Sequence, residues 1–364
     1  KASLTQILQR VQNVTEKKST MPILGNCLIS ASADQTIEFS ATDLELSLWT
    51  KMGAQVEEEG KTTVSARKFL EIIREVPQTT ISVETLPNSK VLVKAGRSRF
   101  ELSTIAAEDF PYVNLYQDLP VFKCESALFR RALQKTFYSI PVEEDSFTPP
   151  GLLWHLVSED TFRFVSTDGH RLAYYEMPAS SFPDVKVREN GIIIPRKAVQ
   201  EIVKLLEGEA EVQIGMDEKS LVLRTSDTYL SSLLLEAEFP EYQVIIPDER
   251  PFGFTIESDV LHPALKRMAV VTDMTYRHVR LNITKDSLEL ESENPELGNA
   301  NDVLDIEYGG EDFNIAFNVK YILDCIQVME SPTIRFEWVD QYHGGIFLSP
   351  DDPGYLSLVM PMVV

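Results

Sequence analysis

The sequence has few cysteines and no long hydrophobic run. Its three cysteines, Cys27, Cys124 and Cys325, lie far apart and form no CxxC pair. An odd number of isolated cysteines argues against a disulfide framework or a zinc knuckle, and it fits a reducing compartment. No stretch approaches the ~18 consecutive apolar residues of a transmembrane helix. We therefore expect a cytoplasmic globular protein whose cysteines are small core residues.

Motifs of enzymes and cofactor-binding proteins are also missing. The sequence has no GxxxxGK[ST], GxGxxG, HExxH or GxSxG motif, and its five histidines show no metal-ligand spacing. The best catalytic candidate is the run Thr-Asp-Gly-His-Arg at 167–171, where Asp168 and His170 could polarise each other. Neither a nucleophile nor a second carboxylate accompanies it. We expect a binding or structural turn there, with no cofactor and no metal; an enzyme using Asp168 and His170 is the alternative.

Positive charge is scarce. The 364 residues include 34 Lys and Arg against 56 Asp and Glu, a net charge of −22, which taken alone argues against a nucleic-acid partner. However, the six expected helices (3–16, 66–76, 126–137, 196–206, 259–271 and 318–329) hold 13 basic and only 6 acidic residues. Helix propensity is an incomplete explanation, because Glu is as good a helix former as Lys or Arg. The distribution favours helices that face a polyanion and strands that face away from it.

One pattern of four landmarks occurs three times at a spacing of about 125 residues, too long for a solenoid repeat. The landmarks are a helix with a leucine beside basic residues, a strand ending in a polar turn, a second helix start, and a closing proline. The leucines of the first helix are Leu8, Leu133 and Leu265, and the polar turns contain Asp43, Asp168 and Asn294. The second helix starts near Ala66, Pro195 and Asn318, and the closing prolines are Pro111, Pro240 and Pro361. This predicts three homologous domains, 1–120, 121–247 and 248–364. Each is α+β, with two helices and antiparallel strands.

Short segments along the whole chain carry a family resemblance. They are Pro-Ile-Leu-Gly-Asn at 22–26, Ala-Thr-Asp-Leu-Glu at 41–45, Ala-Arg-Lys-Phe at 66–69, Arg-Ser-Arg-Phe at 97–100, Asp-Phe-Pro at 109–111, Thr-Asp-Gly-His-Arg-Leu at 167–172, Ile-Pro-Arg-Lys at 194–197, Phe-Asn-Val-Lys-Tyr at 317–321 and Val-Met-Pro-Met at 359–362. In this order they make the chain resemble the bacterial sliding clamp family, the β subunit of DNA polymerase III.

The resemblance implies the DNA clamp fold and a head-to-tail homodimer that closes into a ring. The ring would encircle duplex DNA and slide on it without reading bases, as a processivity factor that tethers the replicative polymerase. The clamp loader, other polymerases and repair proteins would bind through short linear motifs, and no membrane is involved. An acidic interaction scaffold that does not encircle DNA is the alternative.

The family's partner site is an apolar groove between the second and third domains. By resemblance, its residues here are Thr167, Gly169, His170, Arg171, Leu172, Pro240, Ile245, Asn318, Tyr321, Leu358, Met360, Pro361 and Met362, with Leu172, Ile245, Leu358 and Met360 lining the deep pocket. Three positions depart from the family pattern. The chain ends in Val363-Val364 without the usual basic residue, Pro149 replaces a frequent leucine, and Val244 stands where the best-known member has arginine. These departures predict a different peptide preference.

Two further sets of residues are expected at the DNA and at the dimer seam. The DNA-facing set combines a loop position implied by resemblance, Lys18, with basic residues of the expected helices: Arg67, Lys68, Arg130, Arg131, Lys135, Arg196, Lys197, Lys266 and Arg267. At the seam, the resemblance places Phe100 and Leu102 opposite Val270 and Val271. It also places Lys68 and Arg99 near the stretch 296–302, which begins at Glu296 and has few carboxylates. We therefore expect apolar contacts to carry much of the seam.

Overall fold

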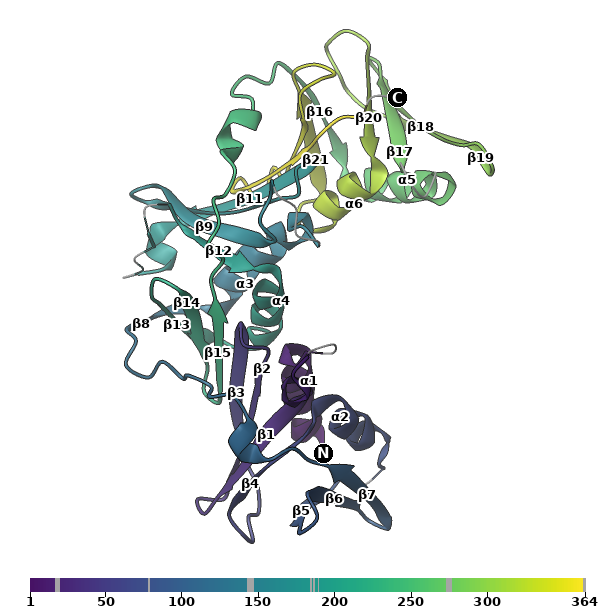
Figure 1. Ribbon diagram of the computed structural model, residues 1–364. Helices are drawn as coiled ribbons and strands as arrows, with labels where there is room; N and C mark the ends of the chain where they lie inside the picture. Colours follow the sequence, from purple (N-terminus) through teal and green to yellow (C-terminus); the bar gives the residue numbers. More distant parts are fainter. Residues whose placement is uncertain are drawn as a thin grey trace. The chain divides into compact units, whose positions relative to one another are not determined.

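The computed structural model describes residues 1–16, 20–77, 79–142, 147–183, 185, 187–188, 190–272 and 277–362 (Figure 1). They form two compact units. The first comprises Lys1–Arg130, Phe182–Val185 and Lys197–Leu234, and the second comprises Arg131–Ser181, Lys186–Arg196 and Leu235–Val364. Each unit is built around one large antiparallel sheet.

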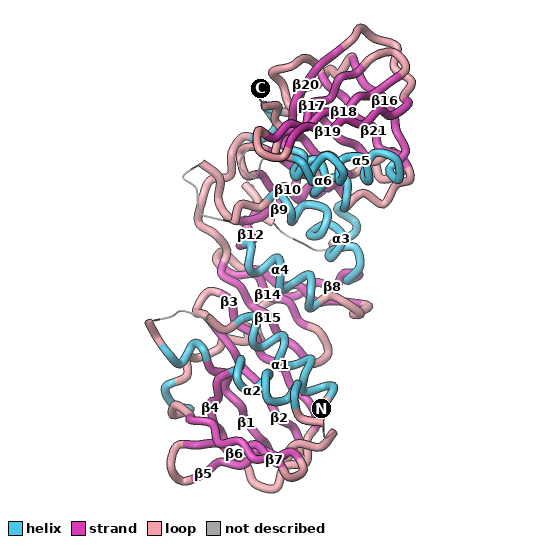
Figure 2. The backbone as a smooth tube through the Cα atoms, turned by 90° about the vertical axis from the view of Figure 1, so that its right-hand side faces the viewer, coloured by secondary structure: helices cyan, strands magenta, loops and turns pink. Residues whose placement is uncertain are grey.

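The six expected helices are confirmed, each with ends within two residues of the prediction. They are α1 (Ala2–Val14), α2 (Ala66–Glu75), α3 (Ser126–Thr136), α4 (Arg196–Leu205), α5 (Ser258–Val271) and α6 (Val319–Gln327). Two begin at side-chain caps, because the Ser65 hydroxyl accepts from the Lys68 N–H and the Asn318 side chain accepts from the Lys320 N–H. Within their units, α1 packs against α2 and α5 against α6 (Figure 2).

The first unit contains an eight-stranded sheet and a three-stranded sheet. The large sheet has the order β4-β1-β2-β3-β15-β14-β13-β8, with β1 (Asn26–Ser32), β2 (Thr36–Thr42), β3 (Leu46–Gly53), β4 (Gly60–Ser65), β8 (Val121–Glu125), β13 (Glu211–Met216), β14 (Ser220–Arg224) and β15 (Thr228–Leu233). The small sheet consists of β5 (Ser82–Leu86), β6 (Lys90–Ala95) and β7 (Ser98–Ser103). Pairing of β3 with β15 joins strands of the first two expected domains.

The second unit repeats this plan. Its large sheet has the order β12-β9-β10-β11-β23-β22-β21-β16, with β9 (Gly151–Ser158), β10 (Thr161–Thr167), β11 (Arg171–Pro178), β12 (Ile192–Pro195), β16 (Phe252–Glu257), β21 (Thr333–Trp338), β22 (Gly345–Leu348) and β23 (Tyr355–Val359). The second sheet consists of β17 (His278–Ile283), β18 (Ser287–Asn294), β19 (Gly298–Asp305) and β20 (Phe313–Asn318). Pairing of β11 with β23 joins the second and third expected domains. Strand pairing therefore continues across both domain junctions.

The large sheet of the second unit is buried on both faces, but by different partners. On one face, Trp154, Phe164, Tyr175 and Tyr355 lie side by side on four neighbouring strands. Tyr355 on this face meets the helices, since its hydroxyl donates to the Cys325 carbonyl of α6 at 3.1 Å. Successive side chains of a strand point to opposite faces, so Leu153, Val165, Tyr174 and Leu356 form the corresponding row on the other face.

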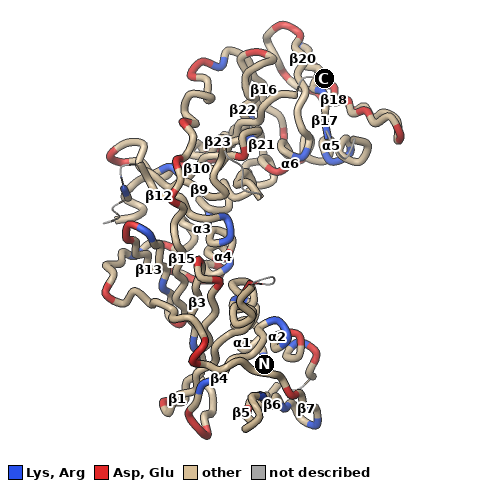
Figure 3. Tube along the Cα trace, in the orientation of Figure 1, with Lys and Arg blue, Asp and Glu red and all other residues tan. Residues whose placement is uncertain are grey.

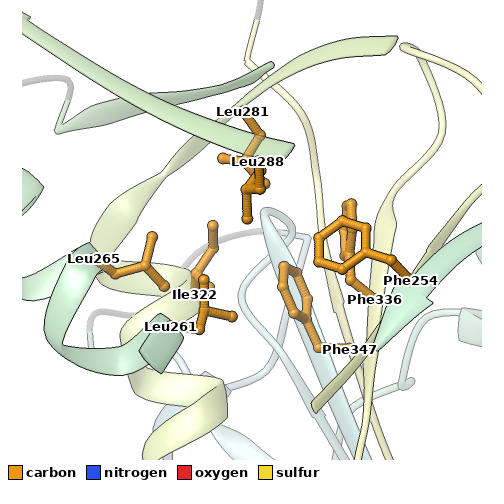
Figure 4. Close-up of a pocket in the computed structure, with 8 residues that line it drawn as sticks. All are labelled: Phe254, Leu261, Leu265, Leu281, Leu288, Ile322, Phe336 and Phe347. Atoms are coloured by element: carbon orange, nitrogen blue, oxygen red, sulfur yellow. The ribbon is translucent and has the colours of Figure 1, made fainter. Parts of the chain in front are cut away.

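The interior between α5, α6 and the neighbouring strands contains a small apolar pocket. Figure 4 shows its eight lining side chains: Phe254, Leu261, Leu265, Leu281, Leu288, Ile322, Phe336 and Phe347. All eight are buried and none is polar, so this pocket belongs to the hydrophobic core and offers no chemistry.

Candidate functional site

The second face of the large sheet in the second unit carries an apolar patch. Its buried members are Leu153, Val165, Leu172, Ile193, Tyr242, Ile346, Leu356 and Leu358, and the partly buried Tyr174, Leu235, Phe239, Ile246, Leu348 and Met360 pack against them. Strand register brings them together, because Leu172 pairs with Leu358, which in turn pairs with Ile346. Of the residues expected in the deep pocket, Leu172, Leu358 and Met360 belong to this patch.

The chain between β15 and β16 forms one wall of the patch. Phe239, Tyr242 and Ile246 of this segment contact it, whereas the expected Ile245 remains 42% exposed. Pro240, also expected here, is half-buried two residues before Tyr242. The sequence reasoning missed Tyr242 and Ile246; the signal was the spacing of Phe239, Tyr242 and Ile246, three and four residues apart, which places apolar side chains on one face of a helical turn.

A hydrogen-bond network fixes Tyr242 in place. The Arg163 guanidinium donates to the Tyr242 hydroxyl oxygen at 2.9 Å, and the same hydroxyl lies 2.9 Å from His155 Nε2. Arg163 can only donate, so the phenolic hydrogen is free to bond to His155. Burial, helped by the Arg163 charge, lowers the pKa of His155 to about 4, which keeps the imidazole neutral and able to accept. Glu176 completes the network by accepting from Arg163 Nε at 2.9 Å.

The run at 167–171 forms a tight polar turn between β10 and β11. The Thr167 hydroxyl donates to the Arg171 carbonyl at 2.8 Å and accepts from the Gly169 N–H at 3.2 Å. Asp168 Oδ1 accepts from the N–H groups of His170 and Arg171. Gly169 has φ +81°, a conformation that glycine adopts without strain. The Asp168 carboxylate therefore stabilises the turn, and the His170 ring stacks instead on Tyr321.

Arg171 is the buried centre of this turn. Its guanidinium donates to Asp168 at 2.9 Å, to Asp324 at 2.7 Å and to the Tyr138 carbonyl at 2.8 Å. It also lies 4.4 Å from the centre of the Tyr321 ring. With 8% of the residue exposed, Arg171 offers little surface to a ligand. Its contacts make it a residue that positions the turn against α6.

The end of the chain runs beside this turn. The Met360 N–H donates to the His170 carbonyl at 2.9 Å, and the Met362 N–H donates to the Ala316 carbonyl at 2.8 Å. Met360, Pro361 and Met362 are all half-buried. Asn318 caps α6. The structure thus places Leu172, Leu358 and Met360 on the apolar patch, and it brings the turn at 167–171, Tyr321 and residues 360–362 beside one another on elements of the same unit.

The expected DNA-facing residues differ widely in exposure. Figure 3 shows basic segments along the helices; Arg67, Lys68, Lys266 and Arg267 are exposed, and Arg130, Arg131, Arg196 and Lys197 are half-buried. Several already have protein partners: Lys197 contacts Asp43, Arg196 donates to the Ile140 carbonyl, and Arg267 donates to Asp302 at 2.8 Å. Lys18 lies outside the described residues.

Lys135 is a clear correction. Only 2% of the residue is exposed, and its ammonium group donates to the Val328 carbonyl and lies 3.3 Å from Asp352. It also sits 5.6 Å from the centre of the Tyr355 ring. The prediction that Lys135 faces DNA is wrong, because the packing of α3 directs this side chain into the protein interior.

The expected seam residues occupy two sheet edges and one helix end. Phe100 and Leu102 are half-buried, and Arg99 is exposed, on β7, an edge strand of the three-stranded sheet. Val270 is 77% exposed near the end of α5, with Val271 half-buried beside it. Glu296 is exposed next to β19, which is likewise an edge strand. Exposed apolar residues and unpaired strand edges are features of surfaces that join another chain.

The cysteines, possible metal ligands and helix lengths also bear on predictions made from the sequence. The three cysteines are free and buried, as predicted, and burial raises the pKa of the Cys27 and Cys325 thiols to about 12. In the part of the chain that the structure describes, no group of three or more His, Cys, Asp or Glu side chains could hold a metal ion. None of the described helices has both the length and the apolar character needed to cross a bilayer.

Comparison with known proteins gives a consistent result over the whole chain. Sequence models of the DNA polymerase III beta subunit match at residues 1–115 (N-terminal domain), 123–241 (central domain) and 243–363 (C-terminal domain). The beta sliding clamp of Escherichia coli K12 is 32% identical over 364 residues, which cover 99% of this chain and 97% of that protein.

Solved structures agree. A beta sliding clamp from Caulobacter crescentus superposes with a TM-score of 0.92 at 32% identity, covering 100% of this chain and 97% of that one. A sliding clamp from Pseudomonas aeruginosa bound to griselimycin superposes with a TM-score of 0.86 at 30% identity, covering 100% and 98%. With three tandem α+β domains and full-length similarity, this chain belongs to the DNA polymerase III beta subunit family, the beta sliding clamps.

Proposed function

We propose that two copies of this chain close head to tail into a ring around duplex DNA and act as a non-enzymatic processivity factor. The observation that carries the proposal is the charge of the helices: α1 to α6 hold 13 Lys and Arg against 5 Asp and Glu, in a chain of net charge −22. Basic helices supply weak phosphate contacts that read no sequence, while an acidic remainder disfavours DNA elsewhere. Such a ring would work in the cytoplasm, where bacterial DNA is replicated.

The proposed DNA-facing set follows from exposure. Arg67, Lys68 and Lys266 have exposed side chains on helices, whereas Lys135 is removed from the set because it is buried. A sliding ring needs only such loose contacts, because topological linkage, rather than tight binding, keeps the polymerase at a high effective concentration on its template.

The apolar patch is proposed as the groove that binds short peptides of the polymerase, the clamp loader and repair proteins. It combines aliphatic side chains with the adaptable Met360, which suits a site that accepts several sequences. A sliding clamp from Pseudomonas aeruginosa binds griselimycin, which supports the presence of a ligand-binding site in this family.

Ring closure is tested by loading the protein, with a clamp loader, onto nicked circular DNA and then linearising the DNA. A topologically linked ring is released when the ends open, whereas an ordinary DNA-binding protein stays bound. Retention after linearisation contradicts encirclement. Failure to associate with the circle at all favours the acidic interaction scaffold.

The seam predicts the effect of Val270→Arg. This exposed side chain is expected to face Phe100 and Leu102 of the second copy, so an added guanidinium would be desolvated against apolar side chains without a partner for its charge. We expect the dimer dissociation constant to rise by at least about tenfold. Sedimentation measures it. Tyr342→Arg, at another exposed apolar position (73% exposed), is the control and should leave the dimer intact; an unchanged dimer in the Val270 variant argues against this seam.

The Tyr242 network predicts the effect of Tyr242→Phe on peptide binding. Loss of the hydroxyl leaves the Arg163 donor and His155 Nε2 without their buried partner and loosens one wall of the patch. We expect an affinity loss of about three- to tenfold for a fluorescent peptide with a Leu-Ala-Leu-Phe centre, measured by anisotropy. Tyr342→Phe, at an exposed tyrosine, should change nothing; equal affinities in all three proteins would refute a positioning role for Tyr242.

A further inference from the structure

The wall formed by residues 235–250 has two chemically different sides. Phe239, Tyr242 and Ile246 pack on the apolar patch, and the Tyr242 network holds this side in place. Because these contacts with the patch fix the segment, the side chains on its other side also have defined positions. They are apolar in the middle and acidic toward both ends.

The middle of this wall exposes two aliphatic side chains. Val244 is 77% exposed and Ile245 is 42% exposed, directly beside Ile246, which contacts the patch. The wall therefore extends the apolar surface of the patch toward solvent. Exposed aliphatic residues that continue an apolar groove indicate that a bound ligand covers them.

Four exposed carboxylates flank this aliphatic pair. Glu238 and Glu241 precede it, and Asp248 and Glu249 follow it. Among the described residues, none of the four is ion-paired or hydrogen-bonded through its side chain to a cation. They are unlike most carboxylates around the patch, which have such partners.

Five cations around the patch pair with carboxylates: Arg163 with Glu176, Arg171 with Asp168 and Asp324, Lys320 with Asp324, and Arg250 and Arg335 with Glu337. A sixth, Arg196, donates to the Ile140 carbonyl. These six cations stand against eight carboxylates, namely the four paired ones and the four unpaired ones of the wall. The surroundings of the groove therefore carry a net negative charge, and the carboxylates that have no cation partner lie on its wall.

We propose that this groove selects peptides whose apolar anchor residues are flanked by lysine or arginine. The inference rests on the proposed peptide-binding function of the patch. Basic flanks would pair with the unpaired carboxylates, whereas acidic flanks would meet like charge beside an apolar surface that excludes water. The occupant is therefore a basic-flanked apolar peptide, and the wall at 238–249 determines this specificity.

The test compares three labelled peptides that share the centre Leu-Ala-Leu-Phe and carry two Lys, two Ser or two Glu residues on each side. We expect the Lys peptide to bind about tenfold or more tightly than the Glu peptide at about 50 mM NaCl, with the Ser peptide between them. Because the carboxylates are exposed, the ratio should fall toward one at about 500 mM NaCl.

The variant Glu238→Gln/Glu241→Gln/Asp248→Asn/Glu249→Gln assigns the preference to the wall. It should bring the Lys-to-Glu ratio close to one while leaving the affinity of the Ser peptide unchanged. The matched control Glu57→Gln/Glu58→Gln/Asp118→Asn/Glu125→Gln neutralises four other exposed carboxylates, and so has the same net charge. It should keep the wild-type ratio.

The outcomes separate the two proposals. Equal affinities for all three peptides, tighter binding of the Glu peptide, or an equal loss of the ratio in the control variant overturn the inference but leave the groove standing. If no peptide binds, not even the Ser peptide, the proposed groove itself is wrong, and the inference fails with it.

Discussion

Replacing Arg171 by Met is expected to lower the free energy of unfolding by about 3–5 kcal/mol, because it breaks a buried ion pair by removing one partner. The guanidinium is bound by Asp168, Asp324 and the Tyr138 carbonyl. Met fills similar space without these bonds, so Asp168 loses the only cation that it pairs with in the described structure. Denaturant unfolding measures the change.

Lys320→Met provides a matched control for this prediction. Lys320 pairs with the same Asp324, but 49% of its side chain is exposed, so its loss should cost less than about 1 kcal/mol. If both variants lose the same stability, burial of Arg171 contributes nothing particular. The Arg171 variant should also bind peptides more weakly, since the turn it fixes carries His170, whose carbonyl holds the Met360 N–H.

The helices could be predicted closely from the sequence, whereas the sheets could not. Apolar spacing and start residues such as Asn318 are local signals, and they placed every helix end within two residues. Pairing of β3 with β15 and of β11 with β23 joins strands far apart in the sequence. No local pattern encodes such a partner, so the sequence predicted three separate domains without the two continuous sheets that join them.

The candidate site was predictable to a similar degree. Leu172, Leu358 and Met360 were expected from family resemblance and lie on the patch. Ile346 and Leu356 were missed because β22 and β23 are buried on both faces, which removes the alternation that identifies the side of a strand facing a site. Tyr242 was missed because its role depends on His155 and Arg163 from two other strands.

Charge counting identified basic helices but could not tell which way each cation points. Arg131 and Lys135 are one helical turn apart on α3 and were treated alike. In the structure both reach Asp352 of the third expected domain, but Arg131 remains half-buried, with its guanidinium 3.0 Å from Asp352 and from Glu330, while Lys135 is enclosed between Asp352 and the Val328 carbonyl. Only tertiary packing distinguishes a lysine that faces solvent from one that joins two domains.

Lys135→Met should therefore destabilise the protein by about 1–3 kcal/mol without altering DNA binding by the folded ring, because its ammonium group is buried against Asp352 and the Val328 carbonyl, while Arg131 still pairs with Asp352 in the variant. Unfolding measurements give the first value. The salt dependence of DNA affinity gives the second: loss of one phosphate contact lowers its slope by about 1. Glu330→Gln is the control, because Glu330 also lies near Lys135, at 3.6 Å, but its side chain is 66% exposed. This substitution should lower the free energy of unfolding by less than about 1 kcal/mol. A reduced slope with unchanged stability in the Lys135 variant would return this residue to the DNA-facing set, and would mean that the junction between the second and third domains holds without it.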